Sequence, residues 1–336
     1  MVEIIGEIGT NHNGDLDTAY KLIDMAIESK LDTVKFQIYD ADDIVSPLVK
    51  TALYGYDKTT HLYWKDYINK QLITPKEWLK ELVPYAKRRG LQTLATAHSI
   101  EGANYCLEHG IESLKIASMD CNYYTFLEDL SKLDTPLLLS TGMATKEEII
   151  KSSDILLQNQ EDVTLFHCTS TYPTQYNEVN LEFFKFLKTL SPKIGLSDHS
   201  EKNDIAMMSL VYGVCKIEKH ITLDKTTDGP DHPFALDKEG LDDLVQCVRN
   251  GEKALGFEDK IMSQKELENR KKYRRVAIAK KDLHRGDSLQ KSDFIFARPS
   301  EIFENMIDSH QIIEFEQKIL KENIEAGKSL LVSSFV

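Results

Sequence analysis

Short apolar, β-branched runs recur along the first three quarters of the chain, and each is followed by a polar cluster and a stretch of helical period. Several runs are apolar nearly throughout, as expected of strands that are covered on both faces. The pattern therefore predicts an α/β fold. The eight predicted strands are 2–8, 33–39, 91–96, 112–118, 136–141, 163–169, 193–197 and 214–220.

Signals of helix termini fill the gaps between these strands. Residues 74–77 (Thr-Pro-Lys-Glu) have the form of a capping box with proline at the first helical position. Residues 145–148 (Thr-Lys-Glu-Glu) form a second capping box. Asp237 precedes a run whose apolar residues share one helical face, so we predict it as an N-cap.

A (β/α)8 barrel explains this order better than an open doubly wound sheet, which also alternates strands with helices. Eight units close within about 255 residues, which is near the usual barrel size. No GxGxxG, GxxxxGK[ST] or GxSxG pattern follows any predicted strand. We therefore predict a TIM barrel over residues 1–260.

The character of the chain changes after the predicted barrel. Residues 263–275 (SQKELENRKKYRR) are highly charged, which indicates a linker or a solvated helix. Short alternating runs and turn signals at 285–287 and 326–328 then follow. We expect a linker over 261–276 and a small β-rich domain over 277–336, which at roughly 60 residues would need a packing partner.

Composition and charge narrow the classes of partner. The formal net charge is −13, which argues against nucleic acid or an anionic membrane surface as the main partner. No apolar run approaches the roughly 18 to 20 residues of a membrane span, and the first residues lack signal-peptide features. The 5 cysteines are scattered without a CxxC pair. We expect a soluble, cytoplasmic protein.

Polar residues at the ends of the predicted strands indicate an anion site, because chemistry in a TIM barrel sits where the strands end. Lys35 and Lys115 combine with a set of hydroxyls into a ring that suits a phosphate and a carboxylate. The alternative pairs each lysine with a neighbouring Glu or Asp, and the frequency of hydroxyls argues against it. The hydroxyl residues are Thr96, Ser118, Ser140 and Ser197.

A histidine pair indicates a metal site. His199 and His220 end strands seven and eight, which are neighbours in a closed barrel, so their imidazoles can meet above the core. Two histidines with a carboxylate and open positions suit a divalent ion such as Mn²⁺ or Mg²⁺ that acts as a Lewis acid. Glu7, at the end of strand one, is a candidate third contributor.

The connection over residues 40–74 is far longer than a usual loop, which is typical of a lid or a specificity element. Its aromatic residues could stack on a sugar or pack on the barrel rim. They are Tyr54, Tyr56, His61, Tyr63 and Trp64.

The motifs resemble those of the sialic acid synthase family, in the family's order and across nearly the whole barrel. They are EIGTNHNGDLDTA, VKFQIY, SLKIASMDCNYY, LLLSTGMATKEEI, LFHCTSTYPT, IGLSDHS, IEKHITLD and DGPDHPFALD. The tail, RRVAIAKKDLHRGDSLQKSDFIFARP, resembles the antifreeze-protein-like (SAF) domain that ends such synthases. The resemblance implies condensation of phosphoenolpyruvate with an N-acetylated hexosamine to give a nine-carbon 2-keto acid and phosphate. The usual hexosamine in the family is N-acetylmannosamine.

The resemblance also implies a role for each matching position. Phosphoenolpyruvate is expected to contact Lys35, Thr96, Lys115, Ser118, Ser140, Ser170 and Ser197. Gln37, Tyr172 and Asp231 are expected to handle the sugar. His199 and His220 would hold the divalent metal, with Mn²⁺ expected first and Mg²⁺ or Co²⁺ as alternatives. Glu7 matches a carboxylate near the metal and the sugar, and Arg298 would reach into the partner subunit's site in a domain-swapped homodimer. The water that adds in this reaction needs a general base, for which Glu7 and Asp120 are the candidates.

Other functions stay open at this point. Asp120 and Ser170 depart from the Glu and Asn of some members, and legionaminate and pseudaminate synthases share the core motifs but use other acetylated sugars. A Schiff-base aldolase that uses Lys35 or Lys115 is an alternative from another enzyme class. A third possibility is a non-catalytic module in which residues 277–336 bind a glycan or an ice surface.

Overall fold

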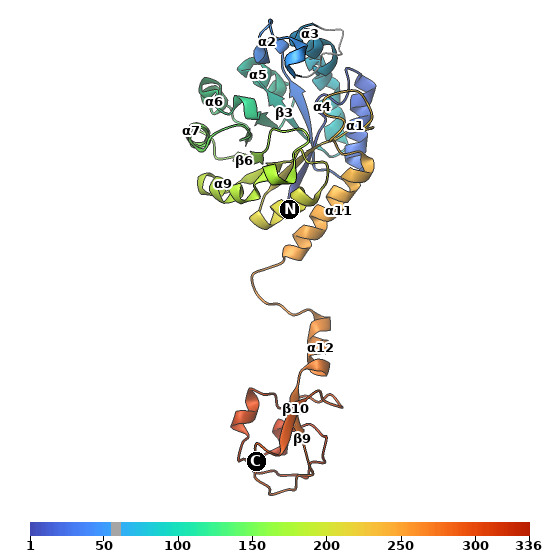
Figure 1. The fold of residues 1–336 in the computed structure, drawn as a ribbon, viewed down its shortest axis with the longest axis vertical. Coiled ribbons are helices and arrows are strands. Elements are labelled where there is room, and N and C mark those ends of the chain that lie inside the picture. The colour runs from blue at the N-terminus through green and yellow to red at the C-terminus, as the bar shows by residue number, and fades with distance from the viewer. Residues whose placement is uncertain (55–61) are drawn as a thin grey trace. The chain divides into compact units, whose positions relative to one another are not determined.

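Eight parallel strands close into a barrel in the computed structural model, which describes residues 1–54 and 62–336 (Figure 1). Neighbouring strands pair in chain order, and β1 pairs with β8 to complete the ring. The predicted barrel is confirmed, and each strand lies within its predicted range apart from a one-residue extension of β3. The strands are β1 (Glu3–Glu7), β2 (Thr33–Ile38), β3 (Gln92–Ala97), β4 (Ser113–Ile116), β5 (Leu137–Ser140), β6 (Val163–Cys168), β7 (Ile194–Ser197) and β8 (Lys216–His220).

Helices between the strands surround the barrel and bury its outer face (Figure 1). The longer ones are α1 (Leu16–Glu28), α4 (Leu79–Arg88), α5 (Ile100–Glu108), α6 (Tyr124–Leu130), α7 (Lys146–Leu157), α9 (Phe184–Leu190), α10 (Asp204–Ser209) and α11 (Lys238–Leu255). Short helical turns are α2 (Ala41–Ile44), η1 (Thr51–Tyr54), α3 (Trp64–Tyr67), η2 (Ile68–Leu72), η3 (Lys76–Trp78), η4 (Ser118–Asp120), α8 (Tyr176–Val179), η5 (Leu181–Phe183) and η6 (Leu210–Tyr212). Within the described residues, none of the helices has the length and apolar character that a membrane crossing requires.

The barrel interior has an apolar floor. Ile5, Leu94, Leu138 and Phe166 form a buried cluster inside the ring, contributed by β1, β3, β5 and β6. On β7 the residue beside Phe166 is Gly195, and a Cβ there would lie 2.7 Å from the Phe166 ring. Glycine at this position therefore leaves the space that the phenylalanine ring fills.

Side-chain alternation along the strands places polar groups above that floor. Residues two positions apart in a strand share a face, so Ile5 and Glu7 both point inward on β1. The register sets Glu7 beside Lys35 on one side and beside His220 on the other. The same alternation brings Ser197 and Glu218 together. The C-terminal ends of the strands thus form a polar mouth over an apolar base.

Two of the three predicted helix caps are confirmed, and the third is wrong. Thr145 and Glu148 form the reciprocal capping box, with the Glu148 amide 3.2 Å from Oγ1 of Thr145. Asp237 caps α11 through the amide of Gly240 at 3.0 Å. Thr74 does not cap a helix, because its hydroxyl is hydrogen-bonded to Nε2 of His12 at 2.8 Å and the chain enters α4 through η3.

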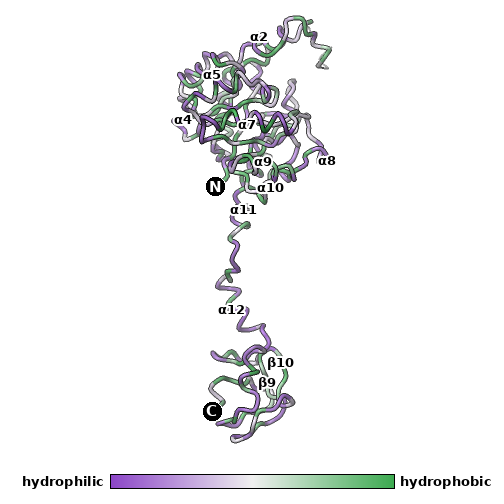
Figure 2. Tube along the Cα trace, turned by 90° about the vertical axis from the view of Figure 1, so that its left-hand side faces the viewer, coloured by the Kyte–Doolittle hydropathy of each residue, from purple (hydrophilic) through white to green (hydrophobic). Residues whose placement is uncertain are grey.

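Residues 257–336 form a second compact unit, separate from unit 1–256. Its regular structure is α12 (Gln264–Tyr273), the antiparallel strands β9 (Val276–Ala279) and β10 (Phe294–Ala297), and the turns η7 (Gln311–Glu314) and η8 (Val332–Ser334). No residue of α12 is buried, and the helix is hydrophilic along most of its length (Figure 2). The charged stretch is therefore a helix, while the resemblance of the tail to an antifreeze-like domain stays a prediction.

His12 should make the stability of the first unit depend on pH. Its Nδ1 accepts from the Gly14 amide, so Nε2 carries the hydrogen that is donated to Thr74 and the ring is neutral. Burial, opposed by Asp15, lowers the pKa of His12 to about 4. The unfolded chain binds this proton more tightly, so stability is complete above pH 6.5 and is lost as the pH falls towards 4, by on the order of 3 kcal/mol.

The measurement compares urea midpoints of the wild type and of His12→Gln between pH 7 and pH 4. Both tryptophans, Trp64 and Trp78, lie in the first unit, and Trp78 packs edge-on against His12, so tryptophan fluorescence follows this unit. The variant should lose less stability than the wild type on acidification. Equal losses in the two proteins would contradict the assignment.

Candidate functional site

A pocket of about 330 Å³ opens at the polar mouth of the barrel. Of the fifteen residues predicted for the site, all of which the structure describes, twelve line this pocket. They are Lys35, Gln37, Thr96, Lys115, Ser118, Ser140, Ser170, Tyr172, Ser197, His199, His220 and Asp231. The other lining residues are Thr10, Tyr39, Ile44, Leu72, His98, Ala117, Met119, Met143, Cys168, Glu218 and Pro230.

The two predicted lysines share one carboxylate. Nζ of Lys35 lies 3.3 Å from Glu218 and 3.2 Å from Glu7. Nζ of Lys115 lies 2.7 Å from the second oxygen of Glu218. Pairing of the lysines with carboxylates, which the sequence analysis disfavoured, is therefore what the structure shows. The reason is that all four groups are almost fully buried, where an unpaired charge is very unfavourable.

Hydroxyl groups complete the surroundings of the lysines. Lys35 donates to Oγ1 of Thr96 at 3.1 Å, and Lys115 donates to Oγ of Ser197 at 3.2 Å. Ser197 donates in turn to Glu218 at 3.0 Å. Glu218 and Ser197 use two of the three donors of the Lys115 ammonium. A donor therefore remains on Lys115 for a bound anion.

The pKa values of these groups follow from burial and pairing. Burial favours the neutral form of Lys35, but Glu218 and Glu7 outweigh it and raise the pKa of Lys35. Burial dominates at Lys115 and lowers its pKa, with repulsion from Lys35 adding to the effect of burial and Glu218 opposing it. Burial also opposes the charged form of Glu218, yet Lys115 and Lys35 hold the pKa of Glu218 well below its usual range.

Two serine hydroxyls flank a glycine backbone at another wall of the pocket. A Cβ on Gly142 would lie 2.3 Å from Oγ of Ser170 and 2.8 Å from Oγ of Ser118. The Gly142 amide donates to Ser118 Oγ at 3.1 Å, so the hydroxyl proton of Ser118 is directed elsewhere. Ser170 Oγ is buried and has no hydrogen-bond partner among the described residues. These hydroxyls are available to an oxyanion.

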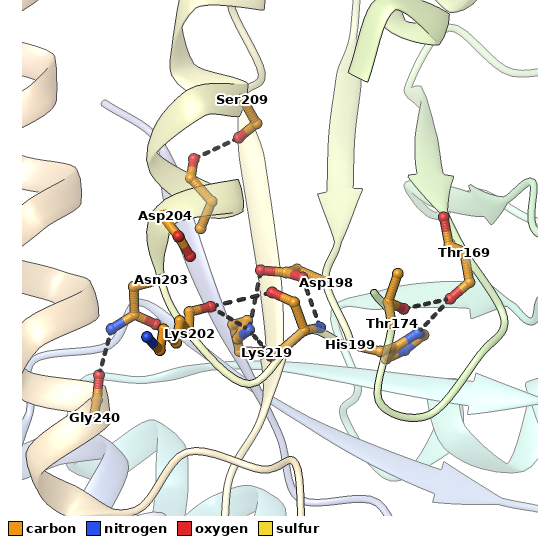
Figure 3. A network of polar contacts seen from close by, with 12 residues as sticks. Thr169, Thr174, Asp198, His199, Lys202, Asn203, Asp204, Ser209, Lys219 and Gly240 are labelled. Atoms are coloured by element: carbon orange, nitrogen blue, oxygen red, sulfur yellow. Dashed lines mark hydrogen bonds and ion pairs between the residues drawn. The ribbon is translucent and has the colours of Figure 1, made fainter. Parts of the chain in front are cut away.

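The histidine pair comes together as predicted. The ring centres of His199 and His220 are 5.4 Å apart, and both rings pack edge-on against Phe234. Nδ1 of His199 donates to the Thr169 carbonyl at 3.0 Å, which leaves Nε2 of His199 as the acceptor of the ring, and the Cys168 thiol also interacts with this imidazole (Figure 3). Nδ1 of His220 lies 3.2 Å from Asp231, but the angles do not suit a hydrogen bond.

These donors fit a divalent metal ion. A ligating histidine commonly donates its other ring nitrogen to a carbonyl, as His199 does to Thr169. The buried Nδ1 of His220, which lies 3.2 Å from Asp231 without a hydrogen bond of good geometry, is a second candidate ligand atom. In the described part of the chain, no group of three or more His, Cys, Asp or Glu side chains is arranged to hold a metal ion. Two imidazoles would leave most positions of a six-coordinate ion to substrate oxygens and water.

The residues predicted to handle the sugar lie on the same side as the histidines. Gln37 donates to Glu7 at 2.5 Å, so the fully buried Glu7 lies behind Gln37 and outside the pocket lining. Asp231 accepts from Thr10 at 3.3 Å. Burial alone would raise the pKa of Asp231, but His220 outweighs it and keeps that pKa low. Tyr172 packs on His199 with ring centres 4.4 Å apart.

Besides Glu7, the other two predicted catalytic residues also lie away from the pocket lining. Asp120 accepts from Nδ1 of His98 at 2.6 Å, and His98 is the residue that lines the pocket. Arg298 lies in the second unit, with its guanidinium 5.2 Å from the ring centre of Tyr273. The trans-subunit role of Arg298 stays a prediction.

The assigned site residues did not include Glu218 and His98, although both are polar residues at or just after the C-terminal end of a predicted strand. Glu218 is two residues before His220 on β8, and the alternation that turns His220 inward turns Glu218 inward as well. His98 lies two residues after Thr96, just beyond the end of β3. Their position at the strand ends was a signal for both, but strand position alone gave neither residue a role.

The described part of the long connection closes one side of the pocket. Ile44 and Leu72 line the pocket, and Trp64 packs in a cluster with Tyr39, Tyr67, Ile68 and Leu72. Trp64 therefore packs on the barrel rim, as one of the two expectations has it. Tyr56 and His61 lie outside the described residues.

Comparison with known proteins places the chain in a family. The model of the NeuB family matches residues 22–260. An N,N'-diacetyllegionaminic acid synthase of Campylobacter jejuni subsp. jejuni is 35% identical over 324 residues, which cover 95% of this chain and 96% of the relative. A pseudaminic acid synthase of the same subspecies is 31% identical over 307 residues, covering 89% of this chain and 88% of the relative.

A solved structure agrees with the sequence comparisons. The N-acetylneuraminic acid (sialic acid) synthetase of Leptospira borgpetersenii, crystallised in complex with citrate, superposes with a TM-score of 0.70 at 30% identity. The superposition covers 80% of this chain and 90% of that one. The chain belongs to the NeuB family, the sialic acid synthase family that its motifs resemble.

Proposed function

We propose that this chain condenses phosphoenolpyruvate with an acetylated hexosamine and releases phosphate and a nine-carbon 2-keto sugar acid. The observation that carries the proposal is one pocket in which two buried lysines and a set of hydroxyls lie beside a histidine pair. Lysines and hydroxyls suit the phosphate and carboxylate of phosphoenolpyruvate. The histidine side suits a sugar carbonyl next to a divalent ion.

The identity of the sugar is supported by the relatives. These relatives are named as synthases of N,N'-diacetyllegionaminic, pseudaminic and N-acetylneuraminic acids. The legionaminic acid synthase at 35% identity favours a 2,4-diacetamido hexose as the first substrate to test. N-acetylmannosamine, which the sequence analysis expected, is the second.

Each group of residues has a separate task in this reaction. Lys35 and Lys115 bind the anionic ends of phosphoenolpyruvate and orient its carbon 3 towards the sugar aldehyde. Holding the two reactants in this geometry lowers the barrier to bond formation. His199 and His220 would hold a divalent ion, which would supply Lewis-acid polarisation of the aldehyde oxygen. The new bond joins carbon 3 to the aldehyde carbon, water adds at carbon 2, and the tetrahedral phosphate intermediate loses phosphate to leave the keto group.

A base must take a proton from the attacking water. Glu7 is paired with Lys35 and Gln37, so its carboxylate is already engaged. Asp120 reaches the pocket through His98, whose Nδ1–H it accepts, and this leaves Nε2 of His98 as an acceptor. We propose the Asp120–His98 pair as the base, with Glu7 holding Gln37 and Lys35 in place.

The central experiment measures phosphate release from phosphoenolpyruvate with 2,4-diacetamido and 2-acetamido hexoses and Mn²⁺. Release should depend on the sugar and should stop when a chelator removes the metal, because the aldehyde is then not polarised. Borohydride with pyruvate should trap no adduct, which separates this reaction from a Schiff-base aldolase. Undiminished phosphate release in the chelated sample would argue against the metal-assisted reaction.

Replacing one lysine tests the anion site. Lys115→Met should raise the KM for phosphoenolpyruvate by roughly tenfold to a hundredfold, because a buried cation that binds the anion is lost. The KM for the sugar should change much less. Lys193→Met, a substitution of a surface lysine paired with Asp162, is the matched control. A Lys115→Met enzyme with the KM of the wild type would exclude Lys115 from the site.

A mixing experiment tests the proposed role of Arg298 in a homodimer. Arg298→Ala should lower activity, because a cation facing the anionic substrates is removed. Co-expressing Arg298→Ala chains with Lys115→Met chains should restore activity, because a mixed dimer then contains one site with both native residues. Mixed samples that only match the sum of the two variants would rule out a contribution across subunits.

A further inference from the structure

Lys219 is a buried lysine on the strand that carries His220, and it does not line the pocket. Its exposed fraction is 1%, and it points to the opposite face of β8 from its neighbours Glu218 and His220. A buried ammonium is unfavourable unless all of its donors are satisfied. The contacts that satisfy it indicate what the residue does.

All three donors of Lys219 bind one short segment after β7 (Figure 3). Nζ lies 3.0 Å from Oδ2 of Asp198, 2.5 Å from the carbonyl oxygen of Ser200 and 3.0 Å from the carbonyl oxygen of Lys202. Oδ1 of Asp198 accepts from the Ser200 amide at 2.9 Å. The segment 198–202 is therefore folded around a single ammonium group.

His199 lies in the middle of this segment, and further hydrogen bonds fix its backbone carbonyl and its ring. Its carbonyl accepts from the Thr174 amide at 3.1 Å, and its Nδ1 donates to the Thr169 carbonyl. Lys219 binds the two residues that flank His199 in the chain, Asp198 and Ser200. We call the three hydrogen bonds from Lys219 to Asp198, Ser200 and Lys202 the Lys219 clamp. Backbone and ring of His199 are thus both fixed relative to β6 and β8 (Figure 3).

Packing alone does not account for this arrangement. A buried ion pair can generally be replaced by apolar residues of similar volume without loss of stability, so ion pairing is weak evidence for a stabilising role. What an apolar pair cannot supply is a donor for the carbonyls of Ser200 and Lys202. Those two contacts fix the path of the backbone that follows His199, over residues 200–202.

We propose that Lys219 is a positioning residue for the metal pair: from the outer face of β8, it fixes the segment 198–202 and thereby holds His199 in place to act with His220. The proposal rests on the metal site of the proposed function. Loss of groups that orient a ligand in this way commonly weakens metal binding about 10- to 100-fold.

The test measures Mn²⁺ binding to the full chain by calorimetry, without substrates. The main variant combines Lys219→Met with Asp198→Asn, so that neither buried charge is left unpaired. Asparagine keeps an oxygen for the Ser200 amide, while the two carbonyls lose their donor. We expect the Mn²⁺ dissociation constant to rise about 10- to 100-fold, with tryptophan fluorescence showing that the barrel remains folded.

Lys202→Met is the matched control. It removes an exposed lysine side chain from the same segment but keeps the backbone carbonyl that Lys219 binds. This variant should bind Mn²⁺ like the wild type. Asp198→Asn alone leaves the ammonium on the carbonyls and should give an intermediate dissociation constant, which provides a test if the double variant does not fold. His199→Asn serves as the reference for loss of a ligand.

The outcomes separate this inference from the proposed function. A folded double variant, or Asp198→Asn if only that variant folds, with the Mn²⁺ affinity of the wild type would overturn the positioning role and leave the metal site intact. Equal weakening in Lys202→Met would also overturn it, because the effect would then not depend on the clamp. Failure of the wild type to bind Mn²⁺ would overturn both this inference and the metal site, while sugar-dependent phosphate release would still support the condensation.

Discussion

Two ammonium groups buried at the mouth of one barrel must share compensating negative charge, and the arrangement of the rest of the pocket depends on this constraint. Glu218 lies between Lys35 and Lys115 and contacts both, while Glu7 adds a second carboxylate next to Lys35. The charges of the four groups balance two against two. Under the proposed function, an incoming anion would meet lysines that are already held in place, so binding would not have to order two flexible side chains.

The same strands serve stability and chemistry at different heights. The lower inward positions are apolar, as with Ile5 and Leu94, and the next inward positions are polar, as with Glu7 and Thr96. A period of two along each strand keeps these layers separate. The reacting groups thus stand on a close-packed base that offers little freedom to shift, which suits catalysis that relies on placing two substrates against each other.

The sequence predicted the barrel well because its signals are local. Each strand is a short apolar run, and the caps at Thr145 and Asp237 use atoms only three residues away. Thr74 shows where local reasoning fails, since its hydroxyl binds His12 from a distant part of the chain. The pairing of Lys115 with Glu218 is another such case, because residues 103 positions apart meet only after the barrel closes. Asp120 reaches the pocket through His98 for the same reason.

The place of Phe166 links the base of the barrel to the lysines above it. Its ring occupies the space that Gly195 leaves open, and the Lys115 ammonium lies 4.7 Å from the ring centre. Any side chain added at position 195 must push the ring aside, and the ring abuts the ammonium. Under the proposed function, in which Lys115 binds phosphoenolpyruvate, a substitution in the apolar interior would therefore change the affinity for that substrate. Structural and functional positions would then not separate by polarity.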